Sequence, residues 1–363
     1  MSAVDGTQAL DDDRQRPDGV AFRLLMDLAE NALERGLAQE EAVRVATTAF
    51  VESLPTFAGI MTTSLHRRKA DLIADRARER AALAERIDEL WGTALSTYEA
   101  VAQVAAEINA RVYNAYVEDN DNSSDVTAEV AFVLHARACT TAAEVLCLMR
   151  SGLADGAAAR RRTIHELSVV LNLVVDHQQL DLAQRYVDYA IVERWGDIEQ
   201  HQLHAAALGY APILAPVVAE AEQQYQDMLR KYGDSFRKRN RWAAPLFAAE
   251  RDVQFVELER LAGLERWRPL YRESNHHVHA GPFAAERSIQ LLPVGQTIRI
   301  GAHDEHDVSE VGTSALISLL QCTAALGGLA DVGEDPEYLM MLMCMHELVD
   351  HAGLAFERIA SRL

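Results

Sequence analysis

The sequence predicts an all-α fold: a multi-helix bundle with a long helical N-terminal arm and one small β-hairpin. Composition is the first observation, because hydrophobic residues make up 49% of the 363 residues and charged residues make up 25%. Ala, Leu, Glu and Arg are abundant, and their side chains lose little rotamer freedom in a helix. The second observation is a long heptad pattern, and the third is a single segment, 288–301, that alternates apolar and polar residues around a Pro-Val-Gly turn.

Three regions are expected along the chain. Residues 1–19 are acidic and lack an apolar run, so they predict a disordered lead and not a signal peptide. Residues 20–120 predict a helical arm that breaks near Gly36 and bends at Pro55. A polar run then predicts the domain boundary, and either Ser124 or Asp125 is expected to cap the next helix. Residues 124–363 predict the helical bundle domain.

Within the arm, residues at alternating spacings of three and four form a heptad pattern over 70–112, which only an arginine interrupts. The series is Ala70, Ile73, Ala77, Arg80, Ala84, Ile87, Trp91, Ala94, Tyr98, Val101, Ala105, Ile108 and Val112. The pattern predicts one long helix packed on its neighbours within the chain. A dimerising coiled coil is the alternative, although a two-stranded coil usually has larger residues than Ala along its seam.

Periodic apolar residues and intervening turns predict the remaining elements. The expected helices span 126–151, 156–175, 180–208, 213–232, 253–261, 308–330 and 336–361, and the hairpin spans 288–301.

The formal net charge of -20 argues against indiscriminate binding to nucleic acid, which depends on neutralising phosphates. One stretch is strongly basic in this acidic chain, and it is the candidate RNA-binding segment. Its basic residues are Arg237, Lys238, Arg239 and Arg241. The four cysteines show no CxxC spacing and predict buried free thiols in a reducing compartment. No run of 18 apolar residues is free of charge, so a cytoplasmic protein without a membrane span is expected.

The segment 271–281, with the sequence YRESNHHVHAG, is the main candidate site. In a helix, Arg272, Asn275, His276 and His279 would share a face and could converge on one pocket, whereas His277 would point elsewhere. Histidine suits proton transfer near neutral pH, and arginine offers a fixed fork for phosphate. The alternative is a helix end whose histidines bond to nearby backbone.

A second candidate is the pair of Arg162 and Glu166, four residues apart at the start of an apolar helix. A surface ion pair is slightly favoured over a pair that faces the core, because buried charges must be fully satisfied. No metal site is expected: His346 and His351 in HExxxH do not face one way on a helix, and the loop with His303 and His306 is interpreted as solvated.

These motifs resemble an uncharacterised bacterial family, the domain of unknown function 5677, over 128–329. The resemblance lies in 135–158, in the Arg162-to-Glu166 helix start and in the element from Tyr271 to His279, where Asn275 stands in place of an expected serine. More distantly, the chain is similar to the HEPN group, whose signature is an arginine, four to six residues and a histidine. Arg272 to His277 and Arg272 to His279 both fit that spacing.

The resemblance implies a metal-independent endoribonuclease of a toxin or antiphage system, without a cofactor and with a site built across a homodimer. Arg272 would hold the scissile phosphate, and His279 would act as acid or base with help from His276 or His277. The alternative is a non-enzymatic interaction or regulatory protein of a defence operon, which Glu273 and the acidic charge favour. The expected partners are RNA, a second copy and a protein from the same operon. A metal-dependent hydrolase is a weaker third option.

Overall fold

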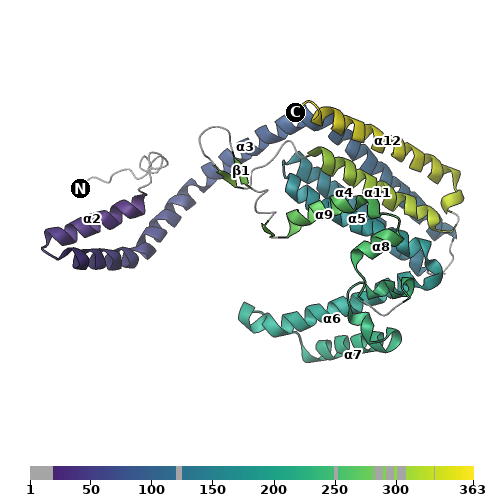
Figure 1. Cartoon of the computed structure of the whole chain (residues 1–363), viewed down its shortest axis with the longest axis horizontal. Coiled ribbons are helices and arrows are strands. Elements are labelled where there is room, and N and C mark those ends of the chain that lie inside the picture. Colours follow the sequence, from purple (N-terminus) through teal and green to yellow (C-terminus); the bar gives the residue numbers. More distant parts are fainter. Residues whose placement is uncertain are drawn as a thin grey trace. The chain divides into compact units, whose positions relative to one another are not determined.

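A computed structural model describes residues 19–119, 125–248, 252–279, 281–282, 289–291, 298–300, 308–330 and 332–363. The chain divides into an N-terminal unit, Met1–Glu79, and a C-terminal unit, Arg80–Leu363. The fold is the predicted helical bundle with a long N-terminal helix (Figure 1). Most of the predicted lead, 1–18, lies outside the described residues.

The α-helices are α2 (Val20–Glu34), α3 (Gln39–Asp119), α4 (Val126–Arg150), α5 (Ala154–Asp176), α6 (Leu182–Leu208), α7 (Ala215–Tyr232), α8 (Phe255–Leu261), α9 (Arg268–Val278), α11 (Val308–Ala325) and α12 (Pro336–Ala360). Short 3-10 turns join them: η2 (Gln178–Leu180), η3 (Asp234–Arg237), η4 (Arg241–Leu246), η5 (Glu265–Trp267), η6 (Leu326–Gly328) and η7 (Val332–Glu334). Two strands, β1 (Ile289–Leu291) and β2 (Ile298–Ile300), pair antiparallel with Gln290 opposite Arg299. They lie where the hairpin is predicted, and its turn lies outside the described residues.

Two features of the N-terminal unit concern the predicted breaks. The break near Gly36 is present, because Gly36 adopts a φ of 87° between α2 and α3. α3 runs through Pro55 without interruption, so the helix does not restart there, and Figure 1 shows that α3 bends in its first part. Proline removes a hydrogen bond to the carbonyl of Val51, but both residues are exposed, so water can satisfy that oxygen.

The second half of the heptad pattern belongs to the core of the C-terminal unit. Ile87, Trp91 and Tyr98 are fully buried, whereas Ile73 in the alanine-rich first half is 54% exposed. The Tyr98 hydroxyl donates to the carbonyl of Ala142 on α4 at 3.1 Å, and the Trp91 and Phe356 rings are 6.0 Å apart. The division between units therefore falls at Glu79–Arg80 and not at the polar run near residue 120, because large apolar side chains after Arg80 join the bundle.

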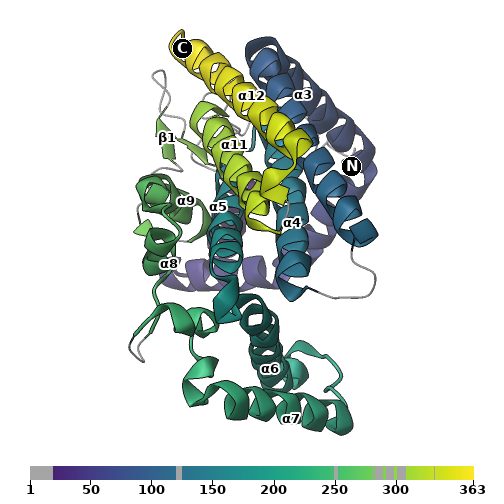
Figure 2. The same ribbon diagram turned by 90° about the vertical axis from the view of Figure 1, so that its right-hand side faces the viewer.

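The bundle core lies between α4, α5, α11, α12 and the second part of α3 (Figure 2). As predicted, α4 begins at an N-cap aspartate, Asp125, whose carboxylate accepts a hydrogen bond from the backbone N–H of Thr127 at 2.9 Å. Gly152 takes a φ of 68° and allows the chain to reverse between α4 and α5. The result brings α5 to the centre of the bundle, and this helix carries most of the polar site described below.

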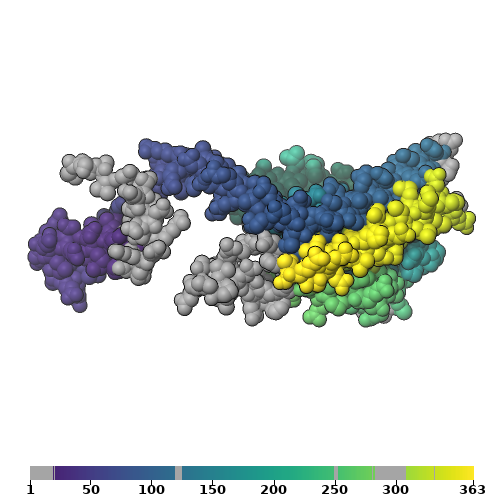
Figure 3. All heavy atoms as spheres, turned by 90° about the horizontal axis from the view of Figure 1, so that it is seen from above, coloured from purple at the N-terminus to yellow at the C-terminus, as the bar shows by residue number. Residues whose placement is uncertain are grey.

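The surface of the C-terminal unit differs in two ways from the sequence predictions. Cys322 is buried and Cys139 half-buried, but Cys147 and Cys344 are exposed, so the prediction of four buried thiols is wrong for two of them. Three helices, α4, α11 extended by η6, and α12, are long and apolar enough to cross a membrane by length and composition alone. Figure 3 shows α12 on the surface, and only 22% of its apolar window is buried. The absence of a membrane span stays a prediction.

Candidate functional site

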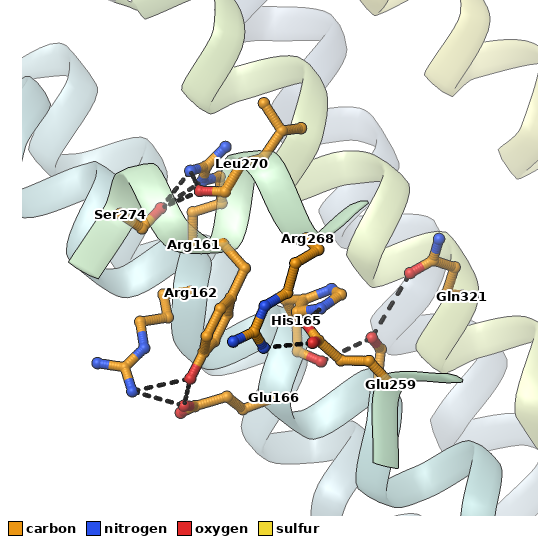
Figure 4. Close-up of polar contacts among 11 residues, drawn as sticks. Arg161, Arg162, His165, Glu166, Glu259, Arg268, Leu270, Ser274 and Gln321 are labelled. Carbon is orange, nitrogen blue, oxygen red and sulfur yellow. Dashed lines mark hydrogen bonds and ion pairs between the residues drawn. The ribbon is translucent and has the colours of Figure 1, made fainter. Parts of the chain in front are cut away.

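A buried polar network joins α5, α8, α9 and α11 inside the apolar bundle (Figure 4). α5 supplies Arg161, Arg162, His165 and Glu166. Because residues four apart share a helical face, Arg161 lies above His165 and Arg162 above Glu166, on two neighbouring faces. Each of these side chains has a partner from α8 or α9. Buried polar groups are tolerated only when they are hydrogen-bonded, so this network fixes how the surrounding helices pack.

Arg161 is the centre of one half of the network and is only 4% exposed. Its Nε donates to the Ser274 hydroxyl on α9 at 3.1 Å, and its Nη1 donates to the Ser314 hydroxyl on α11 at 2.9 Å. Its Nη2 donates to the carbonyl of Leu270 at 2.5 Å and also contacts the Ser274 hydroxyl. One guanidinium therefore ties α5 to α9 and α11.

Burial lowers the pKa of Arg161, and the negative charges of Glu310 and Glu273 oppose that shift. The Glu310 carboxylate lies 3.6 Å from Nη1. The side chain of Glu310 is 56% exposed, so this ion pair is largely screened by solvent. The hydroxyls and the carbonyl, not the carboxylate, supply most of the bonding to Arg161.

The second part of the network is a triangle of Arg162, Glu166 and Tyr271. Arg162 Nη2 donates to Glu166 Oε1 at 2.8 Å and to the Tyr271 hydroxyl at 3.0 Å, and that hydroxyl donates to Glu166 Oε1 at 2.8 Å. The predicted i,i+4 pair is therefore present, but it is not a plain surface pair. Its side chains are 16% and 34% exposed, and a buried tyrosine from α9 closes it.

The third part is a carboxylate, Glu259 on α8, which is fully buried. His165 Nε2 lies 2.9 Å from its Oε1, and Arg268 Nη1 lies 2.5 Å from its Oε2. The Tyr271 ring packs beside these groups: its centre is 5.6 Å from that of the His165 ring, 5.0 Å from that of Phe255 and 5.2 Å from Cζ of Arg268. Both oxygens of Glu259 are bonded, as a buried carboxylate requires.

We predict that Tyr271→Phe will destabilise the protein by about 1 kcal/mol, because the ring contacts stay and two hydrogen bonds of the hydroxyl are lost. Burial, followed by the negative charge of Glu166, raises the pKa of Tyr271 to about 12. The folded state therefore holds this proton between about pH 10 and pH 12 while the unfolded state releases it, so stability falls as pH rises through that window. Urea unfolding at pH 8 and pH 11 checks both statements, since the variant should lose less stability than the wild type on alkalinisation. An equal loss in both proteins would contradict the assignment.

A cleft of about 830 Å³ opens next to Arg161, between α5, α9, α11 and α12. Its walls are partly apolar, with Leu270, Ile317 and Leu354 among them. Five carboxylates from the four helices also line it, and they are Asp155, Glu273, Glu310, Asp350 and Glu357. Among the described lining residues, the cationic groups are Arg161 and, when protonated, His277. The described lining of the cleft is therefore strongly acidic, and apolar side chains form part of its walls.

His277 is the candidate catalytic residue that the structure places in this cleft. Its Nδ1 lies 2.8 Å from Asp155 Oδ1, and its side chain is 15% exposed. A carboxylate beside one ring nitrogen fixes the orientation and tautomer of an imidazole and leaves the other nitrogen for a ligand. The sequence prediction placed His277 away from the shared face, and the structure puts it on the face that turns toward the cleft.

The other residues predicted to converge lie elsewhere on α9. Arg272 and His279 are exposed, and neither they, Asn275 nor His276 lines the cleft. α9 ends at Val278, so His279 is the C-cap with extended backbone and does not continue the helical face. Asn275 is half-buried. The four side chains that were predicted to share a pocket therefore do not line this cleft. Glu273 and His277 line it instead.

The four basic residues of the candidate RNA-binding segment differ in their burial. Arg237, Lys238 and Arg239 are exposed, and Lys238 Nζ lies 3.5 Å from Asp252 Oδ1. Arg241 is 5% exposed, and its Nη2 donates to the Ser235 hydroxyl at 3.2 Å. Its predicted role in RNA binding is not supported, because a buried guanidinium that holds a 3-10 turn cannot present its charge to a nucleic acid backbone. The surface patch is reduced to three side chains.

Among the described parts of the chain, no group of three His, Cys, Asp or Glu residues is placed to hold a metal ion. The loop with His303 and His306, interpreted as solvated from the sequence, lies outside those parts. The expectation of a site without a metal stays a prediction.

The sequence interpretation gave no role to six residues of the network: Arg161, His165, Glu259, Arg268, Ser274 and Ser314. Ser274 is fully buried and lies next to Asn275, the position at which the resemblance led us to expect a serine. A signal for Arg161 was available, because it directly precedes Arg162 on an apolar helix and faces the more apolar side. No helical spacing identifies Glu259, because its partner His165 is 94 residues away and its partner Arg268 lies on a different helix.

Comparison with known proteins gives one family match. Residues 128–295, just under half of the chain, match the model of a family of unknown function, DUF5677. No curated protein and no solved structure matches the chain significantly. The matched segment contains α4, α5, α8 and α9, and so it includes most of the buried network. This match supports a relationship between this part of the chain and an uncharacterised family whose function is unknown.

Proposed function

We propose that the protein is a non-enzymatic helical binding protein with a regulatory role, and that the cleft between α5, α9, α11 and α12 binds an organic cation. The observation that carries the proposal is the charge of the lining. Among the described lining residues, five carboxylates from four helices face one guanidinium, so these residues carry an excess of four negative charges when His277 is neutral. Such a field attracts cations and repels phosphates.

The single arginine does not reverse this field for an anionic ligand. The Arg161 guanidinium already donates to Ser274, Ser314 and the carbonyl of Leu270. An incoming phosphate would have to compete with these bonds and pass carboxylates on every wall. A cation instead meets Asp350 and Glu357 on α12, which are exposed; the Asp350 carboxylate also lies 3.5 Å from Nδ1 of the exposed His346.

The shape of the cleft narrows the class of cation. Its volume of about 830 Å³ is in the range of small-molecule sites, and its apolar residues favour a ligand with a hydrocarbon body. A linear polyamine has ammonium groups separated by methylene chains. It would place methylenes on Leu270, Ile317 and Leu354 and ammonium groups on carboxylates from different helices.

Calorimetric titration of the full chain with spermidine tests the proposal. We expect saturable binding that weakens as salt rises, because exposed ion pairs are screened. The double variant Asp350→Asn with Glu357→Gln should raise Kd at least about fivefold, which corresponds to about 1 kcal/mol. Glu347→Gln removes an exposed carboxylate of α12 that is not part of the lining, and it should leave Kd unchanged.

Two results would contradict this function. The first is no heat of binding with spermidine at millimolar concentration under low salt. The second is an equal loss of affinity in the double variant and in Glu347→Gln, since that would show attraction to the overall negative charge and not to the cleft.

A second candidate function is the metal-independent endoribonuclease, and the contact of His277 with Asp155 favours it. A histidine oriented by a carboxylate can take the proton of the RNA 2′-hydroxyl. The 2′-oxygen would attack the phosphorus, the bond to the 5′-oxygen would break, and that oxygen would take a proton from a second acid. Arg272 would contact the phosphate and His279 or His276 would serve as the second group; because these residues do not line the cleft with His277, they would have to come from a second copy of the chain.

Incubation of total RNA with the protein, with and without EDTA, tests this second function. Cleavage that survives EDTA and is lost in Arg272→Ala supports it, and His277→Ala against His279→Ala shows which histidine acts. His346→Ala, an exposed histidine on α12, is the matched control and should cleave as the wild type does. The absence of cleavage under every condition rejects the enzyme, and loss with EDTA indicates a metal-dependent hydrolase. A place in a toxin or antiphage system, and a partner from the same operon, stay predictions.

A further inference from the structure

Among the described residues of the N-terminal unit, 19–79, many large apolar side chains are exposed. The hydrophobic residues that α2 and the first part of α3 bury are three alanines, Ala32, Ala42 and Ala46. The larger apolar side chains of the unit are exposed instead, and Phe22, Met26 and Leu33 form one such row on α2. Two helices joined through alanines bury too little apolar area to offset the entropy of ordering them.

Six of the exposed apolar residues in the first part of α3 form a stripe along one face, and four others, Val45, Val51, Ile60 and Ile73, point away from it. Its members are Val43, Leu54, Phe57, Met61, Leu65 and Leu72. They are separated by eleven, three, four, four and seven residues, and all of these spacings bring side chains to one face of an α-helix. The stripe covers about 44 Å at about 1.5 Å per residue. Met61 is 62% exposed and Leu65 is 57% exposed, so the centre of the stripe is as open as its ends.

An exposed apolar row of this length indicates a binding surface, because monomeric proteins rarely expose large contiguous apolar patches. The distribution of charge along the unit indicates the partner. Residues 53–65 carry no charged side chain. Before them, acidic residues outnumber basic ones, and Asp27 and Glu30 of α2 are exposed. After them comes the basic run Arg67, Arg68 and Lys69, which makes no ion pair with another described residue.

When two copies of this unit lie antiparallel, the acidic section of each copy faces the basic section of the other. The midpoint of the stripe falls between Phe57 and Ala58, inside the neutral section. An antiparallel second helix centred there would place Leu54 beside Met61 of the partner copy. It would also bring the basic run of each copy level with residues 46–48 of α3 in the other, where the acidic α2 lies alongside.

We propose that two copies of the chain associate through the stripe of α3 in antiparallel orientation, with a twofold axis near Phe57–Ala58. Both copies contribute the same surface, as an isologous interface requires. This interface differs from the coiled coil considered for 70–112, whose large residues, from Ile87 to Val112, are already buried in the C-terminal unit. It is also independent of the cleft and of any activity there.

Light scattering coupled to size-exclusion chromatography tests the association on the full chain. The wild type should elute with the mass of a dimer at micromolar concentration. Met61→Glu with Leu65→Glu should raise the dimer dissociation constant at least tenfold, because it places four carboxylates at the centre of the interface. The control pair, Val45→Glu with Thr63→Glu, adds the same charges to exposed positions on the opposite face of α3 and should stay dimeric.

A mixing experiment tests the antiparallel arrangement. Arg68→Glu with Lys69→Glu makes both ends of the surface acidic, and Asp27→Lys with Glu30→Lys makes both ends basic. Each variant alone should shift toward monomer, which a parallel pair would not do, because its like-charged ends already face each other in the wild type. An equimolar mixture should regain the dimer mass, since the contacts at both ends are then between opposite charges. Circular dichroism of each variant serves as the control and should show that the helices are retained.

The proposal fails if the wild type is monomeric at micromolar concentration. It also fails if the Met61→Glu, Leu65→Glu variant dimerises as the wild type does. Dimers that weaken with the central variant but are not restored by mixing would reject the antiparallel arrangement.

Discussion

Replacing Arg161 with methionine is expected to destabilise the C-terminal unit by about 3 kcal/mol, the largest effect that we predict for a single side chain. Methionine can fill much of the space of the arginine stem but has no hydrogen-bond donor. The Ser274 and Ser314 hydroxyls and the carbonyl of Leu270 would then lose a charged partner inside the bundle. Because the guanidinium joins three helices, the loss should reduce the cooperativity of their packing as well.

The neighbouring arginine provides the control. Arg160 lies one position earlier on α5, contacts Glu144 at the surface and has a side chain that is 37% exposed. Exposed ion pairs contribute little, so Arg160→Met should cost less than about 1 kcal/mol. All four tryptophans belong to the C-terminal unit, so tryptophan fluorescence during urea unfolding follows that unit alone. Equal costs for the two substitutions would show that the Arg161 contacts do not stabilise the fold.

A second large effect is expected on acidification, and His135 is its source. This histidine is fully buried on α4, with Nε2 at 2.9 Å from the Thr323 hydroxyl and Nδ1 at 3.6 Å from the Cys139 sulfur. Burial lowers the pKa of His135 from 6.5 to about 4. Between these two values the unfolded chain binds a proton that the folded chain does not, so stability falls as pH falls. The full loss from this residue is about 3 kcal/mol between pH 7 and pH 4.

The measurement is the free energy of unfolding at a series of pH values from 7 to 4. Carboxylates titrate in the same range, so the informative quantity is the difference in slope between wild type and His135→Gln. The variant keeps a side chain that can hydrogen-bond to Thr323 and removes the titration, and its stability should therefore fall less steeply. His346→Gln, at an exposed histidine of α12, should keep the slope of the wild type. A wild-type slope in His135→Gln would mean that this imidazole is protonated in the folded state.

The helical elements could be predicted from the sequence because their signals are local. Asp125 at the start of α4 and the glycines after α2 and α4 mark helix ends by chemistry that acts within a few residues. Pro55 does not end α3, because the Val51 carbonyl that loses its hydrogen bond is on an exposed residue and is accessible to water. The unit boundary could not be predicted, since a heptad pattern shows that a face is apolar but not which helices cover it.

The candidate site was predicted in part. The pair of Arg162 and Glu166 follows from helical spacing alone, and Tyr271 was singled out in the right segment. The contact that joins them spans more than a hundred residues and depends on how α9 packs on α5. The same packing turns His277 toward Asp155 and leaves Arg272 exposed to solvent. A helical wheel of the segment shows which residues share a face, but not which face the rest of the chain covers.

The covered half of α3 has a consequence for any attempt to isolate the family-like part of the molecule. The matched segment, 128–295, contains α4 and α5 but neither the buried half of α3 nor α11 and α12. Tyr98 bonds to α4, Trp91 packs on Phe356, and α11 covers α5, so these helices supply walls that the segment does not contain. Residues 128–295 are therefore not an autonomous folding module. Expressed alone, this fragment should aggregate, and the shortest soluble version should begin near Arg80 and extend through α12.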